Sequence, residues 1–159
     1  MARNDPLKDP YTAWERGKFR VAFRLFVVQA KAGDSGARLN LGYFYDVGLG
    51  TRKNKAQALR WYRRAYQQGS GAAASNIATV YRDEGRPALA LAWYKRAVSL
   101  KDDDAAVEVA KHYLEGSGVR KHSGLAIAAL KRAVTSRNIT QAGREEARRL
   151  LRRVQRVAT

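Results

Sequence analysis

The sequence predicts an all-α fold of stacked antiparallel helix pairs, and three observations support this. A tyrosine recurs at Tyr45, Tyr81 and Tyr113, at intervals of 36 and 32 residues. Small apolar residues recur at four-residue steps before each tyrosine, which is typical of one face of a helix. A second set of small residues recurs after each tyrosine, and in the first two copies it includes a Trp-Tyr pair. Repeats of this length indicate stacked helix pairs, with about seven to eight helices in all and a capping helix at the C-terminus.

The clearest copy of the repeat spans residues 35–69. Its first predicted helix has Ala37 and Leu41 on one face, and Gly48 and Gly50 end that helix. A predicted capping box follows, because an asparagine at the start of the second helix can accept a backbone N–H and a glutamine three residues later can reach back. The residues of this second helix that carry the prediction are Asn54, Gln57, Ala58, Trp61, Tyr62 and Ala65, with Gly69 as the stop.

The pattern divides the rest of the chain into segments of the same kind. Residues 11–159 are expected to form a single repeat domain after a flexible N-terminal tail. The predicted segments are the tail (1–10), a leading half-repeat (11–33), a repeat (35–69), a shorter repeat (71–101), a further repeat (103–136) and a C-terminal capping helix (138–159).

The combined pattern, A-x3-LG-x2-Y-x2-G-x-G followed by A-x2-WY-x2-A-x3-G, resembles the Sel-one-like repeat, a relative of the tetratricopeptide repeat. The copy at 37–69 matches this pattern throughout. The copy at 105–134 keeps the glycine loop but has Ala129 and Leu130 in place of Trp-Tyr, and the copy at 73–101 is closer to a plain tetratricopeptide unit. The resemblance implies a right-handed α-solenoid that acts as an adaptor for proteins or peptides.

The resemblance also implies a concave groove lined by the first helix of each pair. Aligning the three copies places the same positions of each copy in this groove. The mixture of apolar, hydroxyl and charged side chains suits a protein or peptide better than a polyphosphate. The predicted partner-binding residues are Leu39, Tyr43, Asp46, Val47, Ser75, Thr79, Arg82, Asp83, Val107, Lys111, Leu114 and Glu115.

The charge of the chain favours an acidic partner. Lysine and arginine number 31 against 14 aspartates and glutamates, which gives a formal net charge of +17. Such a charge attracts acidic proteins, nucleic acids and anionic membrane surfaces alike. The alternative to a protein partner is nucleic acid bound along a basic stripe on the convex face, because regularly spaced cations can follow phosphates. This stripe comprises Arg60, Arg63, Arg64, Lys95, Arg96, Lys131 and Arg132.

Two features weigh against nucleic acid and membrane partners. The aromatic residues sit at predicted core positions, so they are not interleaved with the basic stripe for base stacking. The last segment is a basic amphipathic helix, with a capping box predicted from Asn138 and Gln141, but its apolar face lacks Trp and Phe. A cap on the repeat stack explains this helix better than a membrane surface does.

A second contact surface is predicted in the leading half-repeat. The segment FRVAFRLFVV is apolar around most of its circumference, and it carries two valines where the later copies carry basic pairs. Either residues 1–16 fold over this surface or it forms a homodimer or partner contact. The contact would consist of Phe19, Phe23, Val27 and Val28.

The sequence predicts neither catalysis nor a cofactor. It has no nucleophile motif or phosphate-binding loop, and without cysteine it has no disulfide or cysteine-ligated zinc. The acidic run 102–104 is predicted to cap the helix that begins at Ala105. His112 is expected to be a structural or surface residue, and His122, which occupies the position of Asn54, is expected to have a loop or cap role.

The sequence therefore predicts a non-catalytic adaptor that binds an acidic protein or peptide through the groove. It has neither a secretory signal pattern nor a run long enough to cross a membrane, so a cytoplasmic location is expected.

Overall fold

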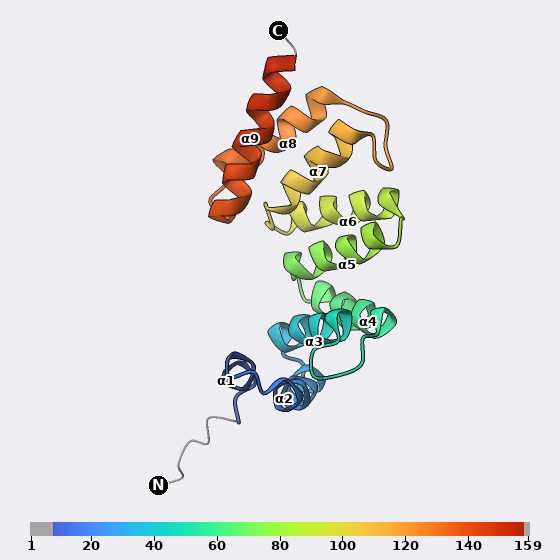
Figure 1. Cartoon of the computed structure of the whole chain (residues 1–159), viewed down its shortest axis with the longest axis vertical. Coiled ribbons are helices and arrows are strands. Elements are labelled where there is room, and N and C mark those ends of the chain that lie inside the picture. The colour runs from blue at the N-terminus through green and yellow to red at the C-terminus, as the bar shows by residue number, and fades with distance from the viewer. Residues whose placement is uncertain (1–7, 158–159) are drawn as a thin grey trace. The chain divides into compact units, whose positions relative to one another are not determined.

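The computed structural model describes residues 8–157, and the regular secondary structure in this range is α-helical (Figure 1). The predicted all-α fold class is thus confirmed. The chain divides after Ser70 into two compact units, one holding α1 to α4 and the other α5 to α9. The helices are α1 (Pro10–Glu15), α2 (Phe19–Ala32), α3 (Ser35–Val47), α4 (Lys55–Gln67), α5 (Gly71–Asp83), α6 (Pro87–Ser99), α7 (Ala105–Glu115), α8 (Ser123–Thr135) and α9 (Gln141–Val157).

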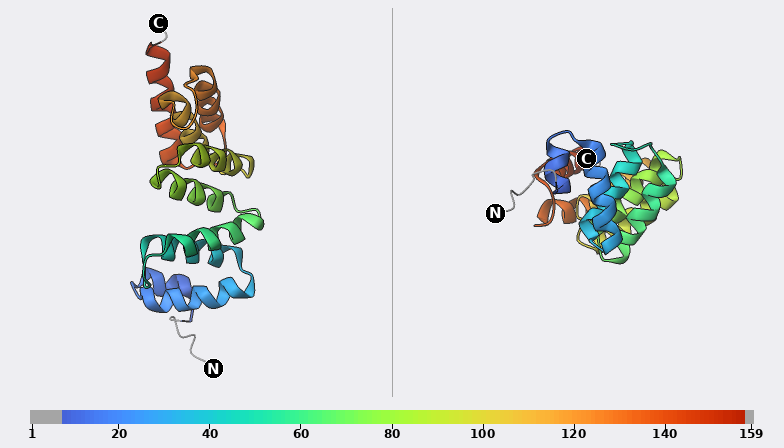
Figure 2. Two further views of the ribbon diagram at one scale, coloured as in Figure 1. Left: turned by 90° about the vertical axis from the view of Figure 1, so that its right-hand side faces the viewer. Right: turned by 90° about the horizontal axis from the view of Figure 1, so that it is seen from below.

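Within each unit, consecutive helices pack side by side as antiparallel hairpins. Helix α3 packs on α4, α5 on α6, and α7 on α8, as two perpendicular views show (Figures 1 and 2). Each pair has a short connection, which favours antiparallel neighbours. That these pairs act together as one repeat domain over 11–159 stays a prediction.

Residues 8–157 contain nine helices, including the short helix α1, whereas about seven to eight were predicted. Proline suits the first position of this helix, because its fixed φ is already helical and its missing N–H is not needed there. The carboxylate of Asp9 accepts a hydrogen bond from the Thr12 N–H at 2.7 Å and so caps the helix. Asp9 and Pro10 belong to the stretch predicted as a flexible tail, while residues 1–7 lie outside the described part.

An aromatic cluster forms the centre of the core of the first unit. Phe26 of α2 and Phe44 of α3 are fully buried, and their ring centroids lie 5.3 Å apart. The ring of Trp14 on α1 packs edge-on against both, at 6.1 Å from Phe26 and 5.1 Å from Phe44. Tyr11 adds another edge contact to Phe26 at 5.2 Å. Helix α1 therefore completes the core of this unit.

The second glycine of each glycine loop fits against the start of an earlier helix in the same unit. Gly50 has a φ of 65°, and a Cβ built on it would overlap the carbonyl of Phe19 at the start of α2. Gly118 has a φ of 70°, and a Cβ there would overlap the backbone N of Ala88 at the start of α6. Only glycine meets both requirements, the positive φ and the close approach.

Two helices begin with the caps expected from the sequence. The Oδ1 of Asn54 accepts a hydrogen bond from the Gln57 N–H at 3.0 Å at the start of α4. The Nδ1 of His122 accepts one from the Leu125 N–H at 3.1 Å at the start of α8. The histidine ring thus does in one repeat what the asparagine amide does in another.

We expect His122→Ala to lower the free energy of unfolding of the α5 to α9 unit by about 1 kcal/mol, because it leaves the Leu125 N–H without its capping acceptor. His122→Asn should retain most of the stability, since asparagine caps α4 in the same way. Urea denaturation followed by circular dichroism measures both variants. Equal losses in the two variants would contradict the capping role.

Helix α9 is capped by Thr140, so the cap predicted at Asn138 is wrong. The Oγ1 of Thr140 accepts a hydrogen bond from the Gly143 N–H at 3.0 Å. The intervening Ile139 is buried and directs the chain inward before the helix begins. Helix α9 then packs on α8 and α7 with Ala147 fully buried, as a capping helix should.

Candidate functional site

In the first unit the predicted groove residues all lie on α3. Tyr43 and Val47 are exposed, at 40% and 48%, and the Tyr43 ring lies 5.8 Å from that of Trp14. Asp46 faces the buried hydroxyl of Tyr62, and burial together with this carboxylate raises the pKa of Tyr62. The four residues are Leu39, Tyr43, Asp46 and Val47, and they present one phenol and one short apolar side chain to solvent.

In the second unit an open hollow of about 400 Å³ is lined by residues of α5, α6, α7 and α9 and of the connections before α7 and α9. The charged residues of its lining are one guanidinium, from Arg82, and four carboxylates, from Asp102, Asp104, Glu108 and Glu146. This hollow is therefore acidic, although the whole chain carries a net charge of +17. The predicted groove residues that line it are Ser75, Thr79, Arg82 and Val107.

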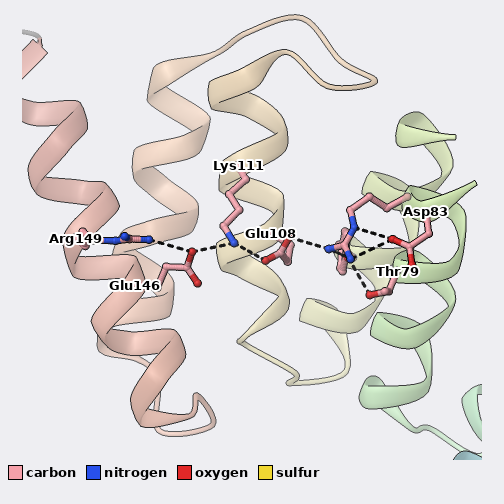
Figure 3. Close-up of polar contacts among 8 residues, drawn as sticks. Thr79, Asp83, Glu108, Lys111, Glu146 and Arg149 are labelled. Carbon is pink, nitrogen blue, oxygen red and sulfur yellow. Dashed lines mark hydrogen bonds and ion pairs between the residues drawn. The ribbon is translucent and has the colours of Figure 1, made fainter. Parts of the chain in front are cut away.

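A chain of ion pairs runs from α5 through α7 to α9 (Figure 3). Its shortest links join the Lys111 Nζ to Glu108 at 2.7 Å and to Glu146 at 2.9 Å. Burial disfavours the charged form of Lys111, but hydrogen bonds to both glutamates outweigh it and raise the pKa of Lys111. Lys111 thus stays charged and ties α9 to α7. In order, the chain comprises Asp83, Arg82, Glu108, Lys111, Glu146 and Arg149.

A second hollow of about 440 Å³ lies between α7, α8 and α9 and shares Lys111 with the ion-pair chain. Half of its lining residues are apolar, and the exposed Arg153 of α9 supplies a further cation. The lining comprises Lys111, Leu114, Glu115, Ser123, Ile127, Leu150, Arg153 and Val154. Of these, only Lys111, Leu114 and Glu115 were predicted as groove residues.

The lining residues missed by the prediction come from α6, α7, α8 and α9 and from the connections before α7 and α9. Leu150 and Val154 belong to the apolar face of the amphipathic helix predicted for residues 138–159, so their half-burial has a sequence signal. That they share a hollow with Ile127 has no such signal, because it depends on how α9 is rotated against its neighbours. The same holds for Glu146, which meets Lys111 across the two helices.

The acidic run before α7 does not cap that helix. Asp104 stands at the N-cap position but makes no side-chain capping bond, so the prediction that this run caps the helix starting at Ala105 is wrong. Asp104 instead accepts hydrogen bonds from the N–H and hydroxyl of Thr140, and Asp102 accepts one from the Ser75 hydroxyl at 2.7 Å. The aspartates thus connect the start of α7 to α5 and α9.

The predicted basic stripe is partly engaged within the protein. The guanidinium groups of Arg64 and Arg96 each lie 4.5 Å from the ring centroid of the tryptophan three residues earlier. Arg132 donates a hydrogen bond from its Nε to the buried Asp103 at 3.1 Å. The Lys95 Nζ lies 5.2 Å from the ring centroid of Tyr113. These contacts hold Arg64, Lys95, Arg96 and Arg132 against the protein. The other stripe residues, Arg60, Arg63 and Lys131, have exposed side chains.

The apolar surface predicted on α2 is only partly covered. Phe23 packs edge-on against Tyr45 at 5.3 Å, and Val27 packs against the core of the first unit. Val28 and Phe19 remain exposed, at 66% and 38%. The homodimer or partner contact stays a prediction, with Phe19 and Val28 as its exposed members.

The described residues include neither a metal-ligand cluster nor a helix able to span a membrane. Within residues 8–157 no group of three or more histidines and carboxylates is placed to hold a metal ion. The Nδ1 of His112 lies 2.7 Å from the carbonyl oxygen of Ser117, so this ring ties α7 to the loop that follows. None of the helices in the same range is both long and apolar enough to cross a bilayer.

Known proteins share both the sequence pattern and the fold. The rat protein named DAP3-binding cell death enhancer 1 is 32% identical over 63 residues, which is 40% of this chain and 12% of the rat protein. The mouse protein of the same name is 30% identical over 77 residues, which is 48% of this chain and 14% of its own length. The chain therefore spans only a small part of these relatives.

A solved structure and a family-wide pattern extend this likeness. The crystal structure of a Sel1 repeat protein from Oxalobacter formigenes matches with a TM-score of 0.68 at 26% identity, over 94% of this chain and 65% of that one. The sequence model of the Sel1 repeat matches residues 35–70, 80–102 and 103–130, which is more than half of the chain. The chain therefore belongs to the Sel1 repeat family.

Proposed function

We propose that this protein is a non-catalytic adaptor that binds an acidic segment of a partner protein. Sel1 repeat proteins generally mediate protein–protein interactions. The names of the rat and mouse relatives describe them as DAP3-binding, which supports a protein as the kind of partner. The net charge of +17 supports an acidic partner, because it speeds encounter and makes binding dependent on salt.

The observation that carries this proposal is the contrast between the two hollows of the second unit. The hollow beside Arg82 contains four carboxylates and would repel an acidic segment. The hollow between α7, α8 and α9 is half apolar and has Lys111 and Arg153 in its lining. An acidic segment therefore fits this second hollow better than the first. Tyr43 and Val47 of the first unit offer a second exposed contact.

The alternative function is nucleic acid binding along the basic stripe. Arg64 and Arg96 lie over tryptophan rings and Arg132 pairs with Asp103, so binding phosphate would compete with existing contacts. A cytoplasmic location and the absence of catalysis belong to the same proposal.

Two double variants separate the surfaces. Tyr43→Ala with Lys111→Met should reduce the amount of acidic protein captured from a lysate at least about tenfold, since it removes an exposed anchor and the cation that Glu108 and Glu146 share. Arg64→Glu with Arg96→Glu should leave capture within about twofold. Arg132 is not reversed, because that change would place two carboxylates together at a buried site.

Quantitative mass spectrometry of the retained proteins measures both variants, and circular dichroism checks that they fold. The opposite pattern, in which only the Arg64 and Arg96 variant loses its ligand, would favour nucleic acid. Retention by both variants at the wild-type level would rule out both surfaces.

A further inference from the structure

The third repeat differs from the other two at one groove position and at one position of the second helix. In the first repeat Asp46 faces the hydroxyl of Tyr62, and in the second Arg82 donates a hydrogen bond to the hydroxyl of Tyr94 at 3.3 Å. The third repeat has leucines at both equivalent positions. Leu130 is fully buried, and Leu114 is half-buried and lines the second hollow. The polar contact of the earlier repeats is thus replaced by an apolar wall.

Helices α8 and α9 extend this wall into a cleft. Ile127 contributes from α8, and Leu150 and Val154 contribute from α9, all of them half-buried. With Leu114 they form what we call the apolar cleft, with a volume of about 440 Å³. This volume lies in the range of pockets that hold small ligands, and it is ample for one or two apolar side chains. The cleft lacks a covering side chain from the described residues of this chain.

The charges around the apolar cleft select the kind of segment that could cover it. Arg153 is exposed in the lining, and Lys111 at the opposite wall is held by two glutamates. Ser123, the first residue of α8, also lines the cleft, so the positive end of the α8 dipole lies beside it. Glu115 is the one carboxylate in the lining. An incoming segment with carboxylates beside an apolar side chain would meet complementary charge.

We propose that the apolar cleft binds an apolar side chain of an acidic partner segment, with a neighbouring carboxylate of that segment paired to Arg153. This inference rests on the proposed adaptor function and assigns the chemistry of its site. A second copy of this chain is a poorer occupant, because each copy carries a net charge of +17 and the two would repel. A basic segment is disfavoured because its positive charges would be repelled by Arg153.

The test uses the full chain with carbon-13 labelled methyl groups and three synthetic ten-residue peptides. One alternates glutamate and leucine, one glutamate and serine, and one lysine and leucine. The methyl signals of Leu114, Ile127, Leu150 and Val154 should shift with the first peptide. The dissociation constants of the other two should be at least about tenfold higher, because each lacks one of the two required features.

Matched variants localise the binding. Ile127→Trp fills the cleft and should weaken binding of the glutamate-leucine peptide at least about tenfold, whereas Leu125→Trp adds the same bulk at an exposed position outside the lining and should leave binding within about twofold. Arg153→Glu should also weaken binding about tenfold. Its control, Arg148→Glu, changes an exposed arginine of α9 that is not in the lining.

Equal binding of the glutamate-serine peptide would show that charge alone suffices and would overturn the proposal, as would equal binding of the lysine-leucine peptide. Folded Ile127→Trp and Arg153→Glu variants that bind like the wild type would also overturn it. The adaptor function fails separately. If a captured acidic protein is retained equally by Ile127→Trp and Leu125→Trp, the adaptor function is supported, but the partner binds outside the apolar cleft and the cleft proposal is wrong. If no protein is captured, the peptide titration still decides the cleft.

Discussion

Gly118→Ala is expected to lower the free energy of unfolding of the α5 to α9 unit by about 3 kcal/mol. A φ of 70° costs a non-glycine residue roughly 1–2 kcal/mol. The added methyl would also overlap the backbone of Pro87 and Ala88, where no flexible side chain can yield. Such overpacking typically costs a further 1–3 kcal/mol. The loop would have to lift from the start of α6.

Gly85→Ala is the matched control in the same unit. Gly85 also has a φ of 70°, but a Cβ on it would meet nothing within 4 Å. It should therefore show the backbone cost alone, roughly 1–2 kcal/mol. Amide hydrogen exchange in residues 71–157 reads the stability of this unit directly. Equal destabilisation by the two variants would mean that the docking of Gly118 on α6 contributes nothing.

Phe26→Ala should destabilise the α1 to α4 unit by about 3–5 kcal/mol, because it empties the centre of a fully packed aromatic cluster. The ring of Phe26 is completely buried and contacts those of Tyr11, Trp14 and Phe44. Its loss removes most of the surface on which α1 rests. We therefore expect fast hydrogen exchange throughout α1 in this variant.

Phe19→Ala removes the same atoms from the exposed end of the same helix. Phe19 is 38% exposed, so its truncation should cost only about 1 kcal/mol. Amide hydrogen exchange of residues 8–70, measured at increasing urea concentrations, gives an unfolding midpoint for each variant. Similar midpoints would contradict the assignment of Phe26 as the centre of the core and of α1 as part of it.

Local chemistry made the start of two helices predictable. Asn54 and His122 each accept a hydrogen bond from a backbone N–H three residues ahead, and such caps depend on neighbouring residues only. The same reasoning gave a wrong prediction for the acidic run 102–104, which does not cap α7. Asp102 meets Ser75 from 27 residues away, and Asp104 meets Thr140 from 36 residues away. No local rule reveals that a distant helix offers a better partner than the adjacent one.

The candidate site also combines features that the sequence predicted with features that it did not. Repeat alignment predicted Ser75, Thr79 and Arg82 as groove residues, because a helix repeat fixes the direction of each position. The structure places all three in the lining of one hollow. It did not predict the carboxylates around that hollow or the apolar cleft next to it. Both arise where α9 meets α7, through contacts such as that of Glu146 with Lys111. The rotation of α9 against α7 and α8 is set by packing across the whole unit.

The central claim is that a protein, not a nucleic acid, is the ligand. Affinity capture with the tagged full chain from a lysate of its own source, run in parallel with and without nuclease, tests it most directly. We expect one acidic protein to remain bound after nuclease treatment and to elute as the salt concentration rises. A broad set of proteins that disappears with nuclease would contradict the adaptor function and assign the ligand to the basic stripe.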